Sequence, residues 1–191
     1  MNADEQELPG PPIDGDETAT LLGSLERQRA TFAWKCGGLD ETGLRTTVGT
    51  STITLGGLLK HLAFVEDFKF STMLHGRDLA PPWDTVDWEA DEDWPWHSAA
   101  EDPPADLYAL WRDAVVRSRA AVADALAKED LGQRIAYVHD SDEEPPSLRR
   151  LLVDVIEEYA RHVGHADLIR EAVDGLTGED PPEVRYPYPA A

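Results

Sequence analysis

The residue types that could hold a metal ion or move a proton gather in one stretch, Val155 to Glu171. Glu158 lies four residues before His162, and His165 lies three residues after it. At about 100° of rotation per helical residue, these three side chains fall within about 60° of one another on one face. A carboxylate and two imidazoles beside an apolar seam are costly to bury unless something compensates them. A divalent metal ion is one such compensation.

The same stretch has the apolar pattern of a packed helix. Its apolar residues recur in alternating steps of three and four, which is the spacing of a helix seam in a bundle. The series includes position 162 and otherwise consists of Leu152, Val155, Tyr159, Ala166, Ile169 and Val173. His162 therefore stands where a core residue is expected.

A second inward histidine lies on an earlier helical pattern. His61 belongs to an apolar stripe at positions i, i+3, i+4 and i+7, with Leu58, Leu62 and Val65. Histidines from two helices, together with Glu158, supply the three ligands of a catalytic zinc-type site that keeps one position open. Nitrogen and oxygen ligands without thiolate suit zinc, nickel, iron or manganese alike.

Each of these residues also has a simpler interpretation. A single inward histidine such as His61 is more often a hydrogen-bonded core residue than a ligand. The spacing of Glu158 and His162 is also common for an ion pair within one helix. His165 could be a further ligand, or it could support a ligand or contact the substrate. The remaining histidines lie outside the stripes and are expected on the surface or in loops: His75, His97 and His139.

Composition excludes several classes of function. The chain of 191 residues carries 38 acidic and 17 basic side chains, a net charge of -21. Such a surface repels phosphate backbones and anionic membranes, so neither nucleic acid nor a membrane is an expected partner. The single cysteine, Cys36, allows no intrachain disulfide and no cysteine-based zinc site. No apolar run resembles a signal peptide or reaches transmembrane length, which predicts a cytoplasmic protein.

The elements that must position these residues are predicted to be helices. We expect a disordered acidic arm over residues 1–16, a helical domain over 17–178 and a C-terminal tail over 179–191. Four amphipathic helices are predicted, from Thr18 or Thr20 to about Lys35, from Thr52 or Thr54 to about Leu74, from about Ala105 to Ala127, and from Ser147 to Asp174. The predicted fold class is all-α, a four-helix bundle with long crossover loops.

Two connections are long. Residues 77–104 contain four tryptophans, so we expect an ordered segment that covers the bundle and contains a short helical turn. Residues 131–146 are predicted to be irregular, with a short extended piece over Ile135 to Val138. The connector over residues 39–51 is predicted to hold a short turn that starts at Asp40 and Glu41.

Two motifs together resemble a known family. They are T-L-G-G-L-L-K-H-L-A-F-V-E, from Thr54 to Glu66, and I-E-E-Y-A-R-H-V-G-H-A-D-L-I-R-E, from Ile156 to Glu171. With the W-x-W segment and the Ser118-Arg119 pair, they resemble the DinB/YfiT-like metalloenzyme superfamily, and in particular its branch DUF664, over about residues 18–178. The resemblance implies a four-helix bundle with a long crossover that binds one divalent metal ion through three residues.

The resemblance also implies a ligand set. The late helix of the family usually offers H-x-x-x-H followed by G-Q; here Glu158 stands at the first His, His162 at the second and His165 at the Gln. A glutamate in the first place also occurs in the mycothiol-dependent maleylpyruvate isomerase branch. The histidine of the second-helix motif falls on His61. The implied metal ligands are therefore His61, Glu158 and His162.

Family members with an assigned activity use the metal in thiol chemistry with mycothiol or bacillithiol. The resemblance therefore implies a metal-dependent thiol S-transferase or isomerase that acts on a small electrophile, with mycothiol as cosubstrate and His165 as proton relay or substrate contact. A homodimer is expected because family bundles often pair. Two alternatives stay open: a metal-dependent hydrolase, and a non-enzymatic, metal-stabilised bundle that acts as a binding or stress-response module.

Overall fold

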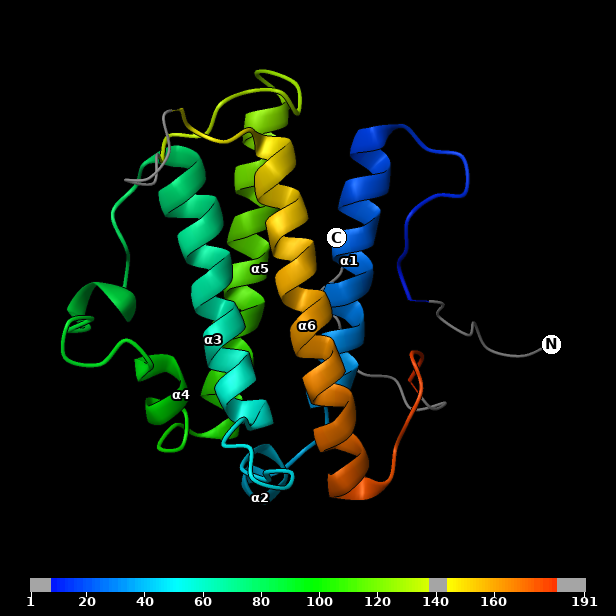
Figure 1. Ribbon diagram of the computed structural model, residues 1–191, viewed down its shortest axis with the longest axis vertical. Coiled ribbons are helices and arrows are strands. Elements are labelled where there is room, and N and C mark those ends of the chain that lie inside the picture. Colours follow the sequence, from blue (N-terminus) through cyan, green and yellow to red (C-terminus); the bar gives the residue numbers. More distant parts are fainter. Residues whose placement is uncertain (1–7, 138–143, 182–191) are drawn as a thin grey trace. The chain divides into compact units, whose positions relative to one another are not determined.

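A computed structural model describes residues 8–137 and 144–181 of the chain (Figure 1). The described residues form four long helices, namely α1 (Glu17–Cys36), α3 (Leu55–Asp67), α5 (Pro104–Leu126) and α6 (Leu148–Asp174). Shorter elements are α2 (Glu41–Leu44), α4 (Trp94–Ser98), the π-helical segment η1 (Phe68–Met73) and the 3-10 turn η2 (Trp83–Thr85). The predicted all-α class and its four long helices are confirmed.

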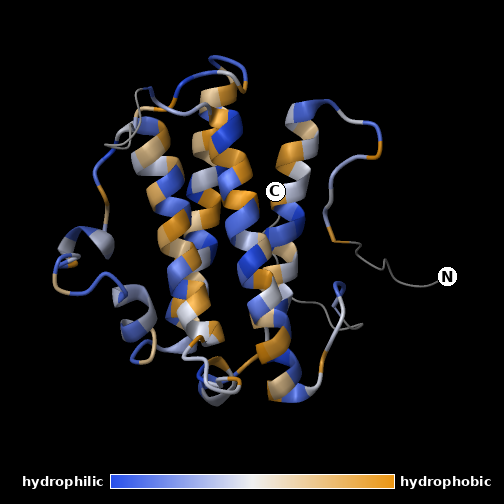
Figure 2. Cartoon of the chain, viewed as in Figure 1, coloured by the Kyte–Doolittle hydropathy of each residue, from blue (hydrophilic) through white to orange (hydrophobic). Residues whose placement is uncertain are grey.

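Each long helix carries both apolar and polar residues along its length (Figure 2). The seam predicted for α6 is buried at Leu152, Val155, Tyr159 and Ala166, each 0 % exposed. Among the described residues, none of the helices combines the length and the apolar character that a membrane span requires.

The helices group into two compact units. One unit comprises residues 1–55 and 156–191, and the other comprises residues 56–155. Helix α6 runs through both, with its proposed ligands after the division and its first two turns before it.

In the first unit, α1 begins earlier than the sequence pattern predicts. The side chain of Asp16 accepts a hydrogen bond of 2.8 Å from the backbone N–H of Ala19, and this makes Asp16 the N-cap. The predicted caps, Thr18 and Thr20, are therefore wrong. The Thr20 hydroxyl instead donates to the Asp16 carbonyl at 2.8 Å. A carboxylate at this place also interacts favourably with the positive end of the helix dipole.

The other end of α1 is held by a cation from α6. Arg170 is 2 % exposed, and its Nη1 donates to the carbonyl oxygens of Trp34, Lys35 and Gly37, the last at 2.7 Å. The last carbonyls of a helix have no partner within the helix, so a buried guanidinium can satisfy several at once. Arg170 therefore fixes α6 against α1 through backbone atoms.

The segment after α6 returns to α1. The ammonium group of Lys35, which is 0 % exposed, donates to the carbonyl of Gly178 at 2.6 Å and pairs with Asp167 at 2.7 Å. The indole N–H of Trp34 donates to the carbonyl of Glu179 at 2.7 Å. The described start of the predicted tail thus lies along α1, and residues 182–191 lie outside the described part of the chain.

In the second unit, the helix predicted to run to Leu74 changes its winding. α3 begins at Leu55, directly after Thr54, and from Phe68 to Met73 the chain winds as the π-helical segment η1. A regular α-helical pattern does not predict such an inserted turn, which is often found at functional sites. Gly76 ends this region with φ of 68°, a conformation that favours glycine.

Two contacts join α3 and α5 within the same unit. Arg117 binds the Asp67 carboxylate through two hydrogen bonds, of 3.0 Å from Nε and 2.9 Å from Nη2. Ser118 Oγ donates to the carbonyl of Glu66 at 3.2 Å. These bonds lie directly before η1 and connect the end of α3 to the middle of α5.

The long connections agree with the predicted pattern in most respects. The tryptophan-containing segment is ordered and contains η2 and α4, as predicted. The predicted short turn after Asp40 is α2, which the Asp40 side chain caps with a hydrogen bond of 2.9 Å from Gly43 N. The extended piece predicted at Ile135 to Val138 is reduced to one antiparallel bridge between Arg134 and Ser147, and residues 138–143 lie outside the described part of the chain.

Candidate metal centre

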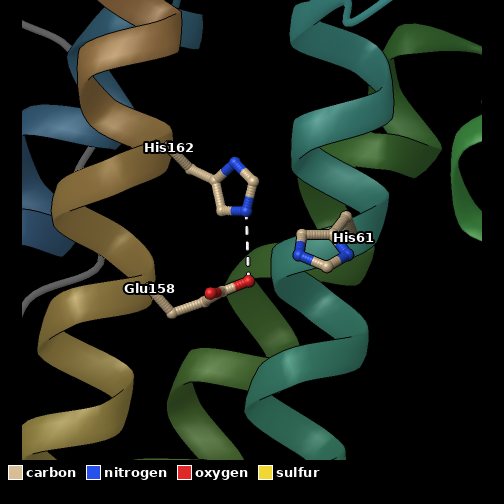
Figure 3. A group of neighbouring side chains, drawn as sticks. All are labelled: His61, Glu158 and His162. Carbon is tan, nitrogen blue, oxygen red and sulfur yellow. Dashed lines mark hydrogen bonds and ion pairs between the residues drawn. The ribbon is translucent and has the colours of Figure 1, made fainter.

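The central pair of the predicted site lies within α6. His162 Nε2 is 3.1 Å from Glu158 Oε1, a hydrogen bond between side chains one helical turn apart (Figure 3). His162 is 7 % exposed, whereas the side chain of Glu158 is 33 % exposed. The carboxylate can only accept, so Nε2 carries a proton in this arrangement. A metal ion in this place would replace that proton.

His165 adds a second imidazole to the pair. Its Nδ1 lies 3.3 Å from His162 Nδ1, with the two rings 5.4 Å apart and inclined by 63°. Partial burial lowers the pKa of His165 below its ordinary value, and the nearby His162 and Arg161 lower it further. The neutral ring can either accept or donate at each nitrogen, depending on its tautomer.

His61 lies on α3 with a partner that the sequence pattern did not indicate. Its ring is stacked on the indole of Trp96, which belongs to α4, with 4.6 Å between ring centroids and 22° between planes. His61 is half-buried rather than fully enclosed. The only sequence signal for this contact is the predicted ordering of the tryptophan-containing segment.

Figure 3 draws His61, Glu158 and His162 as a group of neighbouring side chains. Each offers one ligand atom, and these atoms lie within 4.8 Å of one another. Two imidazole nitrogens and one carboxylate oxygen are a donor set that suits zinc and its neighbours among the divalent metals. His165 is not a member of this group.

The other candidate groups have structural partners. Cys36 is fully buried, and burial raises the pKa of its thiol far above the ordinary range, so it is a poor nucleophile. His75 Nε2 lies 3.0 Å from the carbonyl of Ala121, and His97 Nδ1 lies 3.0 Å from both carboxylate oxygens of Asp91. His139 lies outside the described residues.

Comparison with known proteins gives one assignment. A family model described as mycothiol-S-transferase matches residues 20–175, a span that includes both sequence motifs and all three members of the group in Figure 3. No curated protein matches the chain significantly. Because the match covers most of the chain and this family is DinB/YfiT-like, the predicted superfamily is confirmed, and the chain belongs to the mycothiol-S-transferase family.

Proposed function

We propose that this protein transfers the thiol of mycothiol to a small electrophile with the help of one divalent metal ion. His61, Glu158 and His162 would hold the ion. The observation that carries the proposal is the group of Figure 3, two imidazoles and a carboxylate that lie together in a chain of the mycothiol-S-transferase family.

The residues fit a metal ion chemically. The two neutral histidines and the single carboxylate together carry one negative charge, so a bound divalent ion would keep a net positive charge. When bound, a divalent ion lowers the pKa of a coordinated thiol or water, and so keeps a nucleophile available at neutral pH. The burial of His162 beside an anionic Glu158 is also easier to explain if a cation accompanies them.

The thiol must come from the cosubstrate. Cys36 is the only cysteine in the chain, and its thiol is buried and held in the protonated form. In a substitution, the cosubstrate sulfur loses its proton and bonds to the electrophilic carbon as the bond from that carbon to the leaving group breaks, and the leaving group takes the proton. In an addition, the π bond of the electrophile breaks and the proton goes to the adjacent atom. In an isomerisation, the new C–S bond breaks again and the proton returns to the thiol.

We propose His165 as the group that takes up this proton or contacts the substrate. Its Nδ1 faces His162, so Nε2, on the opposite side of the ring, is the atom assigned to proton exchange. Its contact with His162 also suits a supporting role, because a metal-bound imidazole is commonly held through its second nitrogen. Mutation of His165 to Gln, the residue expected from the family pattern, separates the two roles: a supporting role predicts weaker metal binding, whereas proton exchange predicts a lower kcat with metal retained.

The test combines metal analysis with a conjugation assay. Native protein should contain about one divalent ion per chain, and His162→Ala should lose it. Glu158→Gln should lower metal content, whereas Glu157→Gln, which changes an exposed neighbour on the same helix, should not. Metal-loaded protein should then conjugate mycothiol to members of a panel of small electrophiles.

Two results would contradict the proposal in different ways. Metal-loaded protein that hydrolyses substrates without consuming thiol would favour the hydrolase alternative. Protein that binds no metal, and in which His61→Ala changes only stability, would favour a non-enzymatic bundle.

Two further sequence predictions stay predictions. The cytoplasmic location can be checked by fractionation of cells that express the chain. The homodimer can be checked by light scattering of the purified protein.

A further inference from the structure

Helix α3 has a second face, distinct from its apolar stripe. At about 100° per residue, Lys60, Phe64 and Asp67 fall within about 60° of one another and opposite the stripe of Leu58 and its partners. All three contact tryptophans of the segment over residues 83–98, which we call the tryptophan segment. His61 lies between the two faces, and this accounts for its partial burial.

A buried cation holds α4 against this face. Lys60 is 4 % exposed, its Nζ lies 2.5 Å from Asp102 Oδ2, and it stands 4.1 Å above the ring centroid of Trp94. A buried ammonium group is costly unless it is paired, and here an ion pair and a cation–π contact both compensate it. Trp94 is the first residue of α4 and Asp102 follows the helix by four residues, so the contacts of Lys60 tie the start of α4 and the chain after it to α3.

A second contact, made by Trp83, fixes the start of the tryptophan segment to α3. Trp83 is 0 % exposed, and its indole N–H donates to Asp67 at 2.9 Å. Its ring makes edge contacts with the rings of Trp94 and Phe64, with 6.1 Å and 5.3 Å between ring centroids, respectively. The tryptophan segment is therefore fixed to α3 by buried, directional contacts at residues 60, 64 and 67.

This fixed segment presents Trp96 to His61. The indole covers one face of the imidazole, with 4.6 Å between centroids. A bond from an imidazole nitrogen to a metal ion lies in the plane of the ring, so the stack and coordination do not compete. The stack restricts rotation about the last side-chain bond of His61, a torsion that is otherwise broad.

We infer that Trp96 is a positioning residue that orients the imidazole of His61 for metal binding, an inference that rests on the proposed function. Partners that hold a metal-binding histidine in place usually affect affinity strongly, by about 10- to 100-fold when mutated. Here the partner of the histidine is the face of the Trp96 ring, and the segment that carries Trp96 is held on α3 by the contacts of Lys60 and Trp83.

The experiment compares Trp96→Ala, Trp96→Phe and Trp88→Ala in the full-length protein. Trp88 belongs to the same segment but packs on Phe64, at 4.6 Å, and so serves as the matched control. Zinc affinity is measured by competition with a chromogenic chelator. We expect a loss of about tenfold or more for Trp96→Ala, a smaller loss for Trp96→Phe, which retains an aromatic face, and wild-type affinity for Trp88→Ala.

A metal-free measurement tests the stack by itself. In the NMR spectrum of the metal-free protein, the ring protons of His61 should show an upfield ring-current shift that disappears in Trp96→Ala and persists in Trp88→Ala. If Trp96→Ala does not fold, the shift of the His61 ring protons is compared between the wild type and Trp96→Phe.

The outcomes separate the inference from the proposed function. Wild-type zinc affinity in folded Trp96→Ala, together with loss of binding in His61→Ala, would overturn the role of Trp96 and leave the metal proposal intact. A wild-type protein that binds no zinc would overturn the metal proposal and the role of Trp96 together. Absence of the ring-current shift in the wild type would overturn the stack.

Discussion

Two helices present the proposed ligands, and they are positioned by different means. On α6, Glu158, His162 and His165 meet because of their spacing along one helix. On α3, the ring of His61 takes its partner from α4, 35 residues later in the chain. The first arrangement is local and follows from helical period, whereas the second requires a long connection to fold back and be anchored. We therefore expect changes on α6 to act on the ligands directly, and changes in the tryptophan segment to act through the orientation of His61.

The largest expected effect concerns the attachment of α6. Arg170→Met should lower the free energy of unfolding by about 3 kcal/mol, because the buried carbonyls of Trp34, Lys35 and Gly37 at the end of α1 lose the guanidinium as a hydrogen-bond donor. Urea denaturation of the metal-free protein measures the change. The control is Arg150→Met, which removes an ion pair whose arginine side chain is 61 % exposed, and should cost below about 1 kcal/mol. Equal losses in both variants would show that the buried guanidinium does not anchor the helix.

The second prediction tests whether the metal ion binds at Glu158 and His162 on α6. Zinc at about 100 times its Kd should raise the free energy of unfolding by about 2.7 kcal/mol, because only the folded state assembles the ligands. Glu158→Gln should remove most of this increment, whereas Glu157→Gln should keep it. The measurement is urea denaturation with and without zinc. An increment that survives Glu158→Gln would place the ion elsewhere.

The third prediction tests whether Trp83 anchors the tryptophan segment to α3. Trp83→Phe should cost about 1–2 kcal/mol, because a buried Asp67 loses the indole donor while its bonds to Arg117 stay in place. Trp88→Phe removes a longer bond, of 3.3 Å to the Trp83 carbonyl, and should cost less. Thermal unfolding of the metal-free variants compares them. The reverse order would mean that Trp83 is not the anchor of the segment.

The smallest effect lies at the exposed edge of the same segment. The hydrogen bond and charge of Asp91 raise the pKa of His97 above its ordinary value. A raised folded-state pKa means that the pair stabilises the fold below the ordinary histidine pKa, and that this stabilisation is lost as the pH rises through the folded-state value. NMR titration of His97 should show the raised pKa, and Asp91→Asn should lower it towards the ordinary value. Identical titrations in the two proteins would contradict the pair.

The shared face of the candidate residues on α6 and the helical class could be predicted because both depend on local periodicity. A glutamate and two histidines at positions i, i+4 and i+7 share one face in any α-helix, and the apolar seam places His162 inward. The N-cap of α1 was predicted at the wrong residue because Asp16, Thr18 and Thr20 are all good caps, and their order of preference is weak.

Other features depend on residues that are distant in sequence, and periodicity carries no information about them. The hydrogen bonds from Arg170 to the carbonyls at the C-terminal end of α1 join positions more than 130 residues apart. The π-helical winding of η1 has no signature in the apolar pattern, and the stack of Trp96 on His61 depends on the anchoring of Trp83 and Lys60. Helical spacing thus determined which side chains share a face of α6, whereas long-range packing decided what lies against the faces of α1 and α3. The physical reason is that a helix repeats its geometry every few residues, while a tertiary contact is selected by burial and charge compensation across the whole chain.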